Sequence, residues 1–538
     1  LDELDALNTF SSLIELCQKN QLFTPIGYLQ KIYFAGLPRS CRWIQEHYPN
    51  QVITFMGCED MSDVLRQLDL SDNEIPPHIL EGSRYDHALY NLAEDYIKND
   101  FVSGQSIQKN THYPEYGLRT DRLDLRLKAH QASSDLPLTR LHVGPYHQDR
   151  TKAVDQFKDW CKQLASSGYL DILSIGSSQL TQSNFNENWE GRANGGGVPI
   201  QNEQEYELIY EASRPMLVRT YSGTHRIDKL AEIHERSLNI AWHAMSLWWF
   251  NQLDGRGPND LLTNLIQSEK ALEYIAQTHK PYEPNIAHHF AFRGSDDVTT
   301  ILSAVLAAQF AHKKGVKEFV LQVMLNTPRY TWGIVDIAKA RAILELIESL
   351  RSDRFKLYLQ PRAGLDFFAP DLEKAKVQLA MVSMLMDDIE PEVHNSPPIV
   401  HVVSYSEAVF MANPSVMDES IQISLGAIQF YRQHKQKDAL GSHFEDQIQT
   451  KTKQFVQEVE IILKSIKQHV KNYLSAQGFY DIYAAGYLPT PYLWHATEIF
   501  PNAIYFDSKY ENGSVILVDK EGNTVDAKKR VEFAQKNI

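Results

Sequence analysis

The sequence predicts an α/β fold, a (β/α)8 barrel of the TIM type with a helical extension at each end. From about residue 137 onward, short apolar runs of strand character alternate with longer amphipathic stretches of helix character. Eight such runs lie within about 290 residues, and eight strands, each followed by a helix or loop, are what a closed parallel barrel requires. A doubly wound open sheet is the competing fold.

The predicted strands are short apolar runs bounded by turn residues. In chain order they are LTRLHVG (138–144), LDILSIG (170–176), PMLVRTY (215–221), LNIAWHAM (238–245), PNIAHHFAF (284–292), EFVLQVML (318–325), RFKLYLQP (354–361) and PIVHVVSY (398–405). Helix-like stretches follow several of them, at 225–237, 297–315, 334–351 and 371–388. Strand and helix signals therefore alternate as in successive βα units.

The chain divides into three regions on these patterns. Residues 1–130 are predicted to be mainly helical, residues 131–430 to form the barrel, and residues 431–538 to form a C-terminal helix and tail that pack on it. The tail contains one hairpin-like segment, GSVILVDKEGNTVD (513–526). The N-terminal region is a candidate surface for a partner or for self-dimerisation.

Composition excludes several classes of protein. With 43% hydrophobic residues, a large buried core is expected. The net charge of -15 argues against a non-specific nucleic-acid binder, which needs basic patches to neutralise phosphate. Four cysteines without C-x-x-C spacing indicate neither a disulfide framework nor a zinc motif, and suit a reducing cytosol. No apolar run approaches the length of a membrane span, so we expect a soluble, cytoplasmic protein.

Polar residues at the ends of the predicted strands are the first candidates for a site, because barrel enzymes place their chemistry there. They are Arg140, His142, Gly144, Ser177, Ser178, Arg219, Tyr221, His243, His288, His289, Arg293, Asn326, Gln360, Arg362, Ser404, Tyr405 and Glu407. The set is rich in arginine, histidine and hydroxyl groups. Such donors suit a carboxylate substrate or a large polar cofactor.

The stretch EPNIAHHFAFRGSDD (283–297) combines histidines with aspartates and so invites a metal interpretation. As a strand it would place His288 and His289 on opposite faces, and we favour His288 as the inward one because Phe290 and Phe292 share its face. The aspartate pair that follows suits the N-cap and first turn of a helix better than a metal shell. No metal is expected here, and Arg293 lies where a βα loop would meet a ligand.

Two loops carry further candidates. The run GRANGGGVPI (191–200) could cradle phosphate, but it lacks the Lys-Ser/Thr of a P-loop, so a flexible loop is the favoured interpretation. The run SLWWFNQLDGRGP (246–258) is apolar at first and ends in polar residues and breakers. It predicts a loop mouth floored by aromatic side chains, with Asn251 at its edge.

Four segments in order resemble the large catalytic subunit of adenosylcobalamin-dependent glutamate mutase. They are TRLHVGPYH (139–147), LVRTYSGT (217–224), WWFNQLD (248–254) and VVSYSEAVF (402–410), similar to that family's Arg-x-x-Val-Gly, Arg-His-Gly, Ser-Tyr-Asn-Leu-Pro-Tyr and Lys-Thr-x-x-Glu-Ala motifs. The tail GFYDIYAAGYLPTPYLWHATE (478–498) is more weakly similar to large subunits of lysine and ornithine aminomutases.

The resemblance implies roles for matching residues. Arg140 and Arg219 would bind a substrate carboxylate, and Glu407 would contact the cofactor's ribose. The chain departs from the family where WHAMS replaces its Phe-Glu-Gly-Gly-Gly, which leaves His243 as the nearest titratable group. The second strand's arginine is either replaced by Gln182 or absent, and Val403 replaces a lysine. The full set of expected contacts is His243 and Glu407 for catalysis, Arg140, Arg219, Asn251 and Arg293 for the substrate, and Gly144, His288, Asn326 and Glu407 for the cofactor.

The family's corrin-binding motif Asp-x-His-x-x-Gly does not occur in the sequence, and Asp86-His87 is the nearest approach to it. The resemblance therefore implies a separate small subunit that carries adenosylcobalamin and docks on the barrel mouth. We expect a mutase subunit that rearranges a small carboxylate or amino acid through radicals. The alternatives are an aminomutase that also uses pyridoxal phosphate (PLP), a cofactor-free barrel lyase or hydrolase, and a non-catalytic assembly subunit.

Overall fold

Eight parallel strands close into a barrel with the order β10-β3-β4-β5-β6-β7-β8-β9. The structure is a computed structural model that describes residues 3–23, 29, 31–36, 38–56, 59, 61–75, 83–101, 113–438, 440–493 and 498–538. The barrel strands are β3 (Leu138–Val143), β4 (Ile172–Ile175), β5 (Leu217–Tyr221), β6 (His243–Met245), β7 (Tyr282–Pro284), β8 (Glu318–Leu325), β9 (Lys356–Ala363) and β10 (Ile399–Val402). The predicted (β/α)8 barrel is confirmed.

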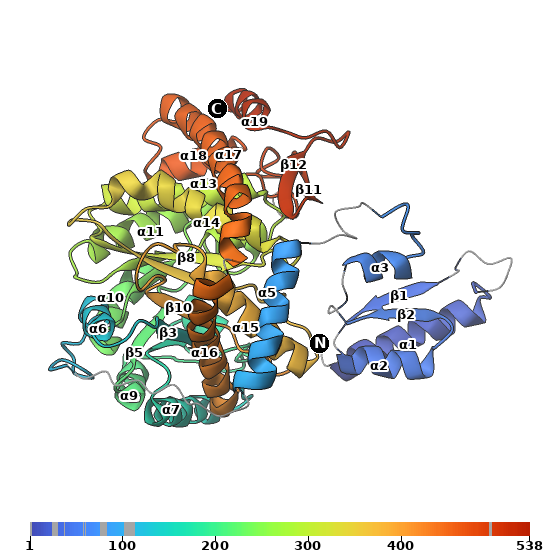
Figure 1. The fold of residues 1–538 in the computed structure, drawn as a ribbon. Helices are drawn as coiled ribbons and strands as arrows, with labels where there is room; N and C mark the ends of the chain where they lie inside the picture. The colour runs from blue at the N-terminus through green and yellow to red at the C-terminus, as the bar shows by residue number, and fades with distance from the viewer. Residues whose placement is uncertain are drawn as a thin grey trace.

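Helices surround the barrel (Figure 1). In the barrel region they are α7 (Arg150–Ser167), α8 (Gln179–Ser183), α9 (Glu203–Ser213), α10 (Ile227–Leu238), α11 (Leu261–Ile275), α12 (Ala287–Ala291), α13 (Asp297–Lys313), α14 (Gly333–Ile347), α15 (Leu372–Asp387) and α16 (Pro414–Asp438), with the 3-10 turns η2 (Gln252–Asp254) and η3 (Glu348–Leu350). Helices α13 and α14 are apolar on nearly every face because α17 covers their outer side.

One predicted strand is wrong. Strand β7 ends at Pro284, and residues 287–291 of the predicted fifth strand form helix α12 instead. The backbone N–H of Phe290 donates to the carbonyl of Ile286, and both side chains are fully buried in the main core. A four-residue spacing of apolar side chains fits one helical face as well as a short strand run, and tertiary packing selects the helix here.

The N-terminal end of the barrel is closed by α6 (Leu123–Gln131). Its Leu123 and Leu127 pack against the first residues of several barrel strands and against Trp242. Arg126 fixes this helix to the barrel, since it forms a buried ion pair with Asp121 and donates to the backbone carbonyl of Asp171 at 3.2 Å. The cavity described below lies toward the opposite end of the strands.

The chain before α6 forms two parts. A small unit of α1 (Glu3–Lys19), β1 (Ile32–Ala35), α2 (Pro38–His47), β2 (Val52–Phe55) and α3 (Met61–Gln67) contains a parallel β1–β2 pair and a core of its own, and it lies to one side of the barrel in Figure 1. Helix α5 (Arg84–Asp95) and the π-helical turn η1 (Tyr96–Phe101) pack instead on α15 and join the main core.

The C-terminal region packs on the barrel helices. It comprises α17 (Leu440–His469), α18 (Ala476–Ala484), an antiparallel hairpin of β11 (Asp507–Glu511) and β12 (Ser514–Val518), and α19 (Ala527–Gln535). The hairpin turns at Asn512 and Gly513, both at positive φ. The predicted hairpin-like segment, residues 513–526, therefore contains only the second strand, β12. The first strand, β11, lies before that segment. Part of the tail that resembles aminomutases, residues 494–497, lies outside the described residues.

Candidate functional site

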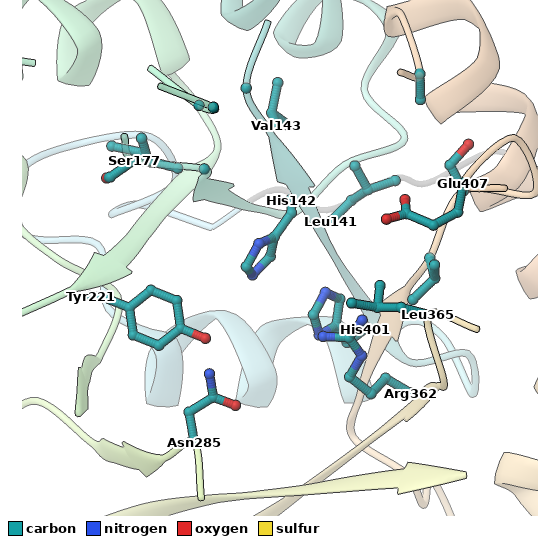
Figure 2. Close-up of a pocket in the computed structure, with 18 of the residues that line it drawn as sticks. Leu141, His142, Val143, Ser177, Tyr221, Asn285, Arg362, Leu365, His401 and Glu407 are labelled. Atoms are coloured by element: carbon teal, nitrogen blue, oxygen red, sulfur yellow. The ribbon is translucent and has the colours of Figure 1, made fainter. Parts of the chain in front are cut away.

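A cavity of about 650 Å³ opens at the carboxyl ends of the barrel strands. Figure 2 shows its interior, with Tyr221 on one side, Arg362 on the other, and His142 between them. The lining residues that carry polar groups are His142, Ser177, Gln182, Tyr221, Arg256, Asn285, His288, His289, Arg362, His401, Ser404 and Glu407. Because the carboxyl ends of all eight strands meet at this face, residues far apart in the chain converge on one volume.

Beneath the cavity lies a buried ionic cluster of Arg140, Arg219 and Glu283, which we call the floor cluster. Glu283 Oε1 accepts from Arg140 Nη1 at 2.9 Å, and its Oε2 accepts from Arg219 Nε at 2.9 Å. The indole Nε1 of Trp242 also donates to Oε2, at 2.6 Å. Burial raises the pKa of Glu283, but the two guanidinium groups outweigh it and lower that pKa to about 2.

Arg140 connects the floor cluster to the cavity wall. Its Nε donates to Ser174 Oγ at 2.7 Å, and its Nη1 also donates to the side-chain oxygens of Gln322 and Gln360. Its Nη2 lies 3.0 Å from His142 Nε2. Burial and the nearby Arg219 lower the pKa of Arg140 to about 9, and the group still carries its proton at neutral pH.

Four histidines line the cavity: His142, His288, His289 and His401. The rings of His142 and His401 stack at 5.0 Å between centroids, and those of His288 and His289 lie 4.3 Å apart. Burial lowers the pKa of each well below its usual value, and positively charged neighbours add to the effect. The imidazoles are therefore neutral at physiological pH, and they serve as hydrogen-bonding groups there.

Arg362 is one of two arginines that line the cavity, the other being Arg256. It lies on β9 with 7% of its surface exposed, and its Nε donates to the backbone carbonyl of Ala363 at 3.1 Å. Within the described part of the chain, no carboxylate lies within ion-pair distance of its guanidinium. Burial lowers its pKa to about 10, so the group stays charged. A charged fork that faces a cavity in this way suits a carboxylate ligand.

The mouth of the cavity is acidic at one point and apolar elsewhere. Glu407, after β10, is exposed there, and the surrounding protein raises its pKa while Arg362 lowers it. Four apolar side chains at the mouth, which we call the rim, are unusually exposed. They are Phe292 (41%), Leu365 (42%), Phe410 (43%) and Met411 (54%). Exposed apolar groups gathered at the mouth of a polar cavity are typical of a surface that another molecule covers.

The structure brings some of the predicted site residues together. Gly144, His288 and Glu407 all line the cavity. Arg140 and Arg219 lie directly beneath it, where both form ion pairs with Glu283. The expected gathering of strand-end groups is thus observed, but the two arginines predicted to bind substrate are already paired within the protein.

Other predicted residues lie elsewhere. His243 is directed into the helix layer, where Nε2 is 3.4 Å from Glu235 of α10 and the ring contacts Tyr274 of α11. Asn251 caps η2, since its Oδ1 accepts from the backbone N–H of Leu253 at 2.8 Å. Neither residue lines the cavity.

Asn326 and Arg293 flank the cavity without lining it. Asn326 adopts positive φ at the end of β8, and its backbone N–H donates to Asp336 at 2.6 Å. Arg293 pairs with Asp254 at 2.5 Å and stacks over Trp249 at 4.0 Å. Both contacts hold loops in place around the mouth.

The prediction that His288 and His289 face opposite ways is wrong. Both side chains lie on α12 and both line the cavity, because adjacent helical positions are separated by about 100° and not by 180°. Helix α13 begins at Asp297 as predicted, with Asp296 at its N-cap. The carboxylate of Asp296 accepts from Thr299 and pairs with Arg530 of α19.

The triple-glycine run forms a loop at the mouth. Gly196 and Gly197 line the cavity, and Val198 bridges to Ser177 before the chain enters α9. Gly197 has φ +87, and a Cβ there would lie 2.4 Å from the carbonyl oxygen of Gly176. The loop thus requires glycine at this position in order to pass close to the end of β4.

Sequence reasoning missed three lumen residues: Glu283, Gln322 and His401. Each is a polar side chain within a barrel strand, and His401 interrupts the run PIVHVV. A polar residue in an otherwise apolar strand of a parallel barrel points either into the lumen or into the helix layer. That signal would have singled out His401, whereas Glu283 was hidden by the wrong placement of its strand.

A scan against protein-family models finds no match for this chain, and a search of curated proteins finds none either. Among the described residues, no three His, Cys, Asp or Glu side chains are arranged to hold a metal ion. No helix in the described ranges is long and apolar enough to cross a membrane.

Proposed function

We propose that this chain is the catalytic barrel of an enzyme that acts on a small carboxylate, and that it works as the large subunit of an adenosylcobalamin-dependent mutase. The observation that carries the substrate class is Arg362, a charged guanidinium on the cavity wall with no carboxylate within ion-pair distance in the described part of the chain. The sequence resemblance supports the cofactor and the reaction class. The exposed rim supports a partner that covers the mouth.

In this proposal Arg362 holds the substrate carboxylate through charge-assisted hydrogen bonds. Arg140 and Arg219 lie deeper and both donate to Glu283, whereas Arg219 Nη1 has no hydrogen-bond partner among the described residues. Two arginines against one carboxylate leave the floor cluster with a net positive charge. That charge contributes a favourable field for an anion in the cavity above.

The mouth has features that suit a large cofactor held against a second subunit. The position where a Cβ of Gly196 would sit has no heavy atom within 4 Å, so the loop leaves open space there. Glu407 would accept a hydrogen bond from a ribose hydroxyl, and Gly144 also lines the cavity. Adenosylcobalamin, when bound, supplies a carbon-centred radical. The role of the barrel is to orient the substrate and to keep water out of a closed cavity.

A second candidate is a cofactor-free lyase. The observation that favours it is the set of four neutral histidines around one cavity, which could move protons without a radical. Catalysis by the isolated chain would distinguish it from the mutase, which needs its corrin-bearing partner. The PLP-dependent aminomutase stays an alternative, although none of the described residues that line the cavity is a lysine.

The deciding experiment combines the purified chain with the small protein encoded beside it and with adenosylcobalamin. Carboxylates and amino acids are added in turn, and cob(II)alamin is followed by electron paramagnetic resonance. We expect a signal with one substrate class, and a loss of about 10- to 100-fold in kcat/KM for R362Q. The matched control is R354Q, since Arg354 is exposed before the opposite end of β9.

Three outcomes would contradict the proposal. The mutase assignment fails if no neighbouring protein binds both the chain and the corrin. The lyase replaces it if the chain alone converts a substrate. The role of Arg362 fails if R362Q and R354Q retain equal activity.

A further inference from the structure

Arg140 is a group that can only donate hydrogen bonds, and this property determines where protons lie on its neighbours. Its Nη2 lies 3.0 Å from His142 Nε2. That nitrogen must therefore accept, because both partners cannot donate. The neutral ring of His142 then carries its proton on Nδ1, which has no hydrogen-bond partner among the described residues.

The same guanidinium orients Gln322. Arg140 Nη1 donates to Gln322 Oε1 at 3.3 Å, so this amide end is the oxygen. His401 Nδ1 lies 3.2 Å from the same oxygen and must donate to it. A neutral His401 therefore keeps a lone pair on Nε2, and no described residue donates to that atom.

The amide nitrogen of Gln322 determines the tautomer of a third histidine, His288. Gln322 Nε2 donates to Asn285 Oδ1 at 2.6 Å and lies 3.4 Å from His288 Nδ1. Since the amide nitrogen only donates, His288 accepts at Nδ1 and carries its proton on Nε2.

We propose that Arg140 is a positioning residue that fixes the tautomers of His142, His288 and His401, so that the cavity presents one lone pair and two N–H groups beside Arg362. The pattern is read by a carboxylate that also bears a hydroxyl or amino group. The hydroxyl or amino group of this ligand donates a hydrogen bond to His401 Nε2. A carboxylate oxygen of the ligand accepts from the ring N–H groups of His142 and His288. The catalytic meaning of this pattern rests on the proposed function, whereas the tautomers themselves do not.

Arg140 is held firmly enough for this role. Glu283, Ser174 and Gln360 together engage its Nε and Nη1, so the guanidinium has little freedom to rotate. The depressed pKa values of the histidines keep the rings neutral near pH 7, and a neutral ring has a single proton to place. The positions of hydrogen-bond donors and acceptors on the cavity histidines are thus fixed before a ligand binds.

The test is nitrogen-15 NMR of the full chain labelled at histidine, at neutral pH and without substrate. Signals are assigned with H142Q, H288Q and H401Q. We expect protons on Nδ1 of His142, Nδ1 of His401 and Nε2 of His288. The opposite tautomer at His142 or His401 would overturn the proposal. Because no substrate is present, this result is independent of whether the chain is a mutase.

The variant Q322E sharpens the test. A carboxylate at position 322 still accepts from Arg140 and His401 but cannot donate to His288. We expect a proton to appear on Nδ1 of His288 while His401 is unchanged. The control Q277E changes an exposed glutamine after α11 and should change neither ring. If His288 keeps its wild-type tautomer in Q322E, Gln322 does not transmit the effect of Arg140.

The ligand class is tested with three probes: acetate, glycolate and glycine. Glycolate or glycine should shift the Nε2 signal of His401 at concentrations where acetate does not, and the difference between the two shows whether the hydroxyl or the amino group is recognised. Equal shifts with all three probes, or none with any, would contradict the proposed recognition.

Discussion

The carboxylate of Glu283 on β7 accepts a 2.9 Å hydrogen bond from Arg140 on β3, across the interior of the barrel. Both side chains are fully buried. Arg219 shares the same carboxylate, so one negative charge holds two positive charges beneath the cavity. The contact joins strands on different sides of the barrel and holds the floor cluster in place beneath the cavity histidines.

Replacing Glu283 with Gln should destabilise the protein strongly. The variant leaves two buried guanidinium groups without a compensating charge, and removing one partner of a buried pair costs about 3–5 kcal/mol. Urea unfolding of E283Q should show this loss in the free energy of unfolding. The control E207Q, at an exposed position on α9, should change it by less than about 0.5 kcal/mol. Equal stability of the two variants would show that the floor cluster needs no carboxylate.

Glu283 should also contribute to acid sensitivity. Its pKa is about 2 in the folded protein, against an ordinary value of 4.5. An acid whose folded pKa is lowered adds stability that is present above pH 4.5 and is lost as the pH falls toward 2. Unfolding measured across this range should therefore show a smaller acid loss in E283Q than in the wild type. An identical pH profile would contradict this contribution.

Asp86 should give the opposite pH dependence, with stability that falls as the pH rises. It lies on α5 and accepts from the backbone N–H of Gly333, at the start of α14, at 3.0 and 3.1 Å. Burial raises its pKa from 3.8 to about 7, so the folded protein binds a proton that the unfolded chain releases above pH 4. The free energy of unfolding should therefore fall as the pH rises from about 4 to about 7, and level off above that.

The variant D86N tests this directly. Asparagine keeps an oxygen that can accept from Gly333 but carries no charge. We expect D86N to be at least as stable as the wild type at pH 8, and to lack the fall between pH 4 and 7. Urea midpoints at several pH values give the measurement. A variant that is less stable than the wild type at pH 8 would mean that the charged carboxylate stabilises the start of α14.

The barrel could be predicted from the sequence because its strands are buried on both faces and form nearly continuous apolar runs. Seven of the eight predicted runs overlap an observed strand by three residues or more, and the fifth shares only Pro284 with β7. Strand β7 has only Tyr282–Pro284 and is too short to give such a run, and the apolar residues of α12 give a strand-like run directly after it. The four-residue strands β1 and β2 were missed for the same reason.

The candidate site was predictable in part. Polar residues in apolar strands indicated His142, Tyr221 and Arg362, which all line the cavity. The pairing of Arg140 with Glu283 joins positions 143 residues apart and depends on which strands face each other across the barrel. A residue pattern gives the face of a strand but not the partner across the lumen. The sequence therefore could not indicate that Glu283 pairs with both arginines.

The N-terminal unit should be dispensable for folding of the barrel. Its core of Leu7, Ile14, Ile44 and Val52 is separate from the main core, whereas α5 belongs to the main core. A variant that lacks residues 1–75 should keep a thermal unfolding midpoint within a few degrees of the full chain. Circular dichroism of both forms provides the comparison. A collapse of the midpoint by more than about 10 °C would show that the barrel depends on this unit.

Two neighbouring glycines at the mouth should respond differently to alanine. Gly197 has φ +87, and a Cβ there would lie 2.4 Å from the backbone oxygen of Gly176, so G197A combines a strained backbone with a clash against an immobile atom. We expect it to lose on the order of 2–3 kcal/mol in the free energy of unfolding. Gly196 has open space around its Cβ position and an ordinary φ, so G196A should stay within about 0.5 kcal/mol of the wild type.

Urea unfolding of the two variants under identical conditions gives the comparison, and each serves as the other's control. The difference between them separates the demand for glycine at one position from the general composition of the run. If both variants lose stability equally, the loop tolerates no side chain at either position. If neither does, the loop shifts away from the end of β4 at little cost, and its close passage past Gly176 does not define the mouth of the cavity.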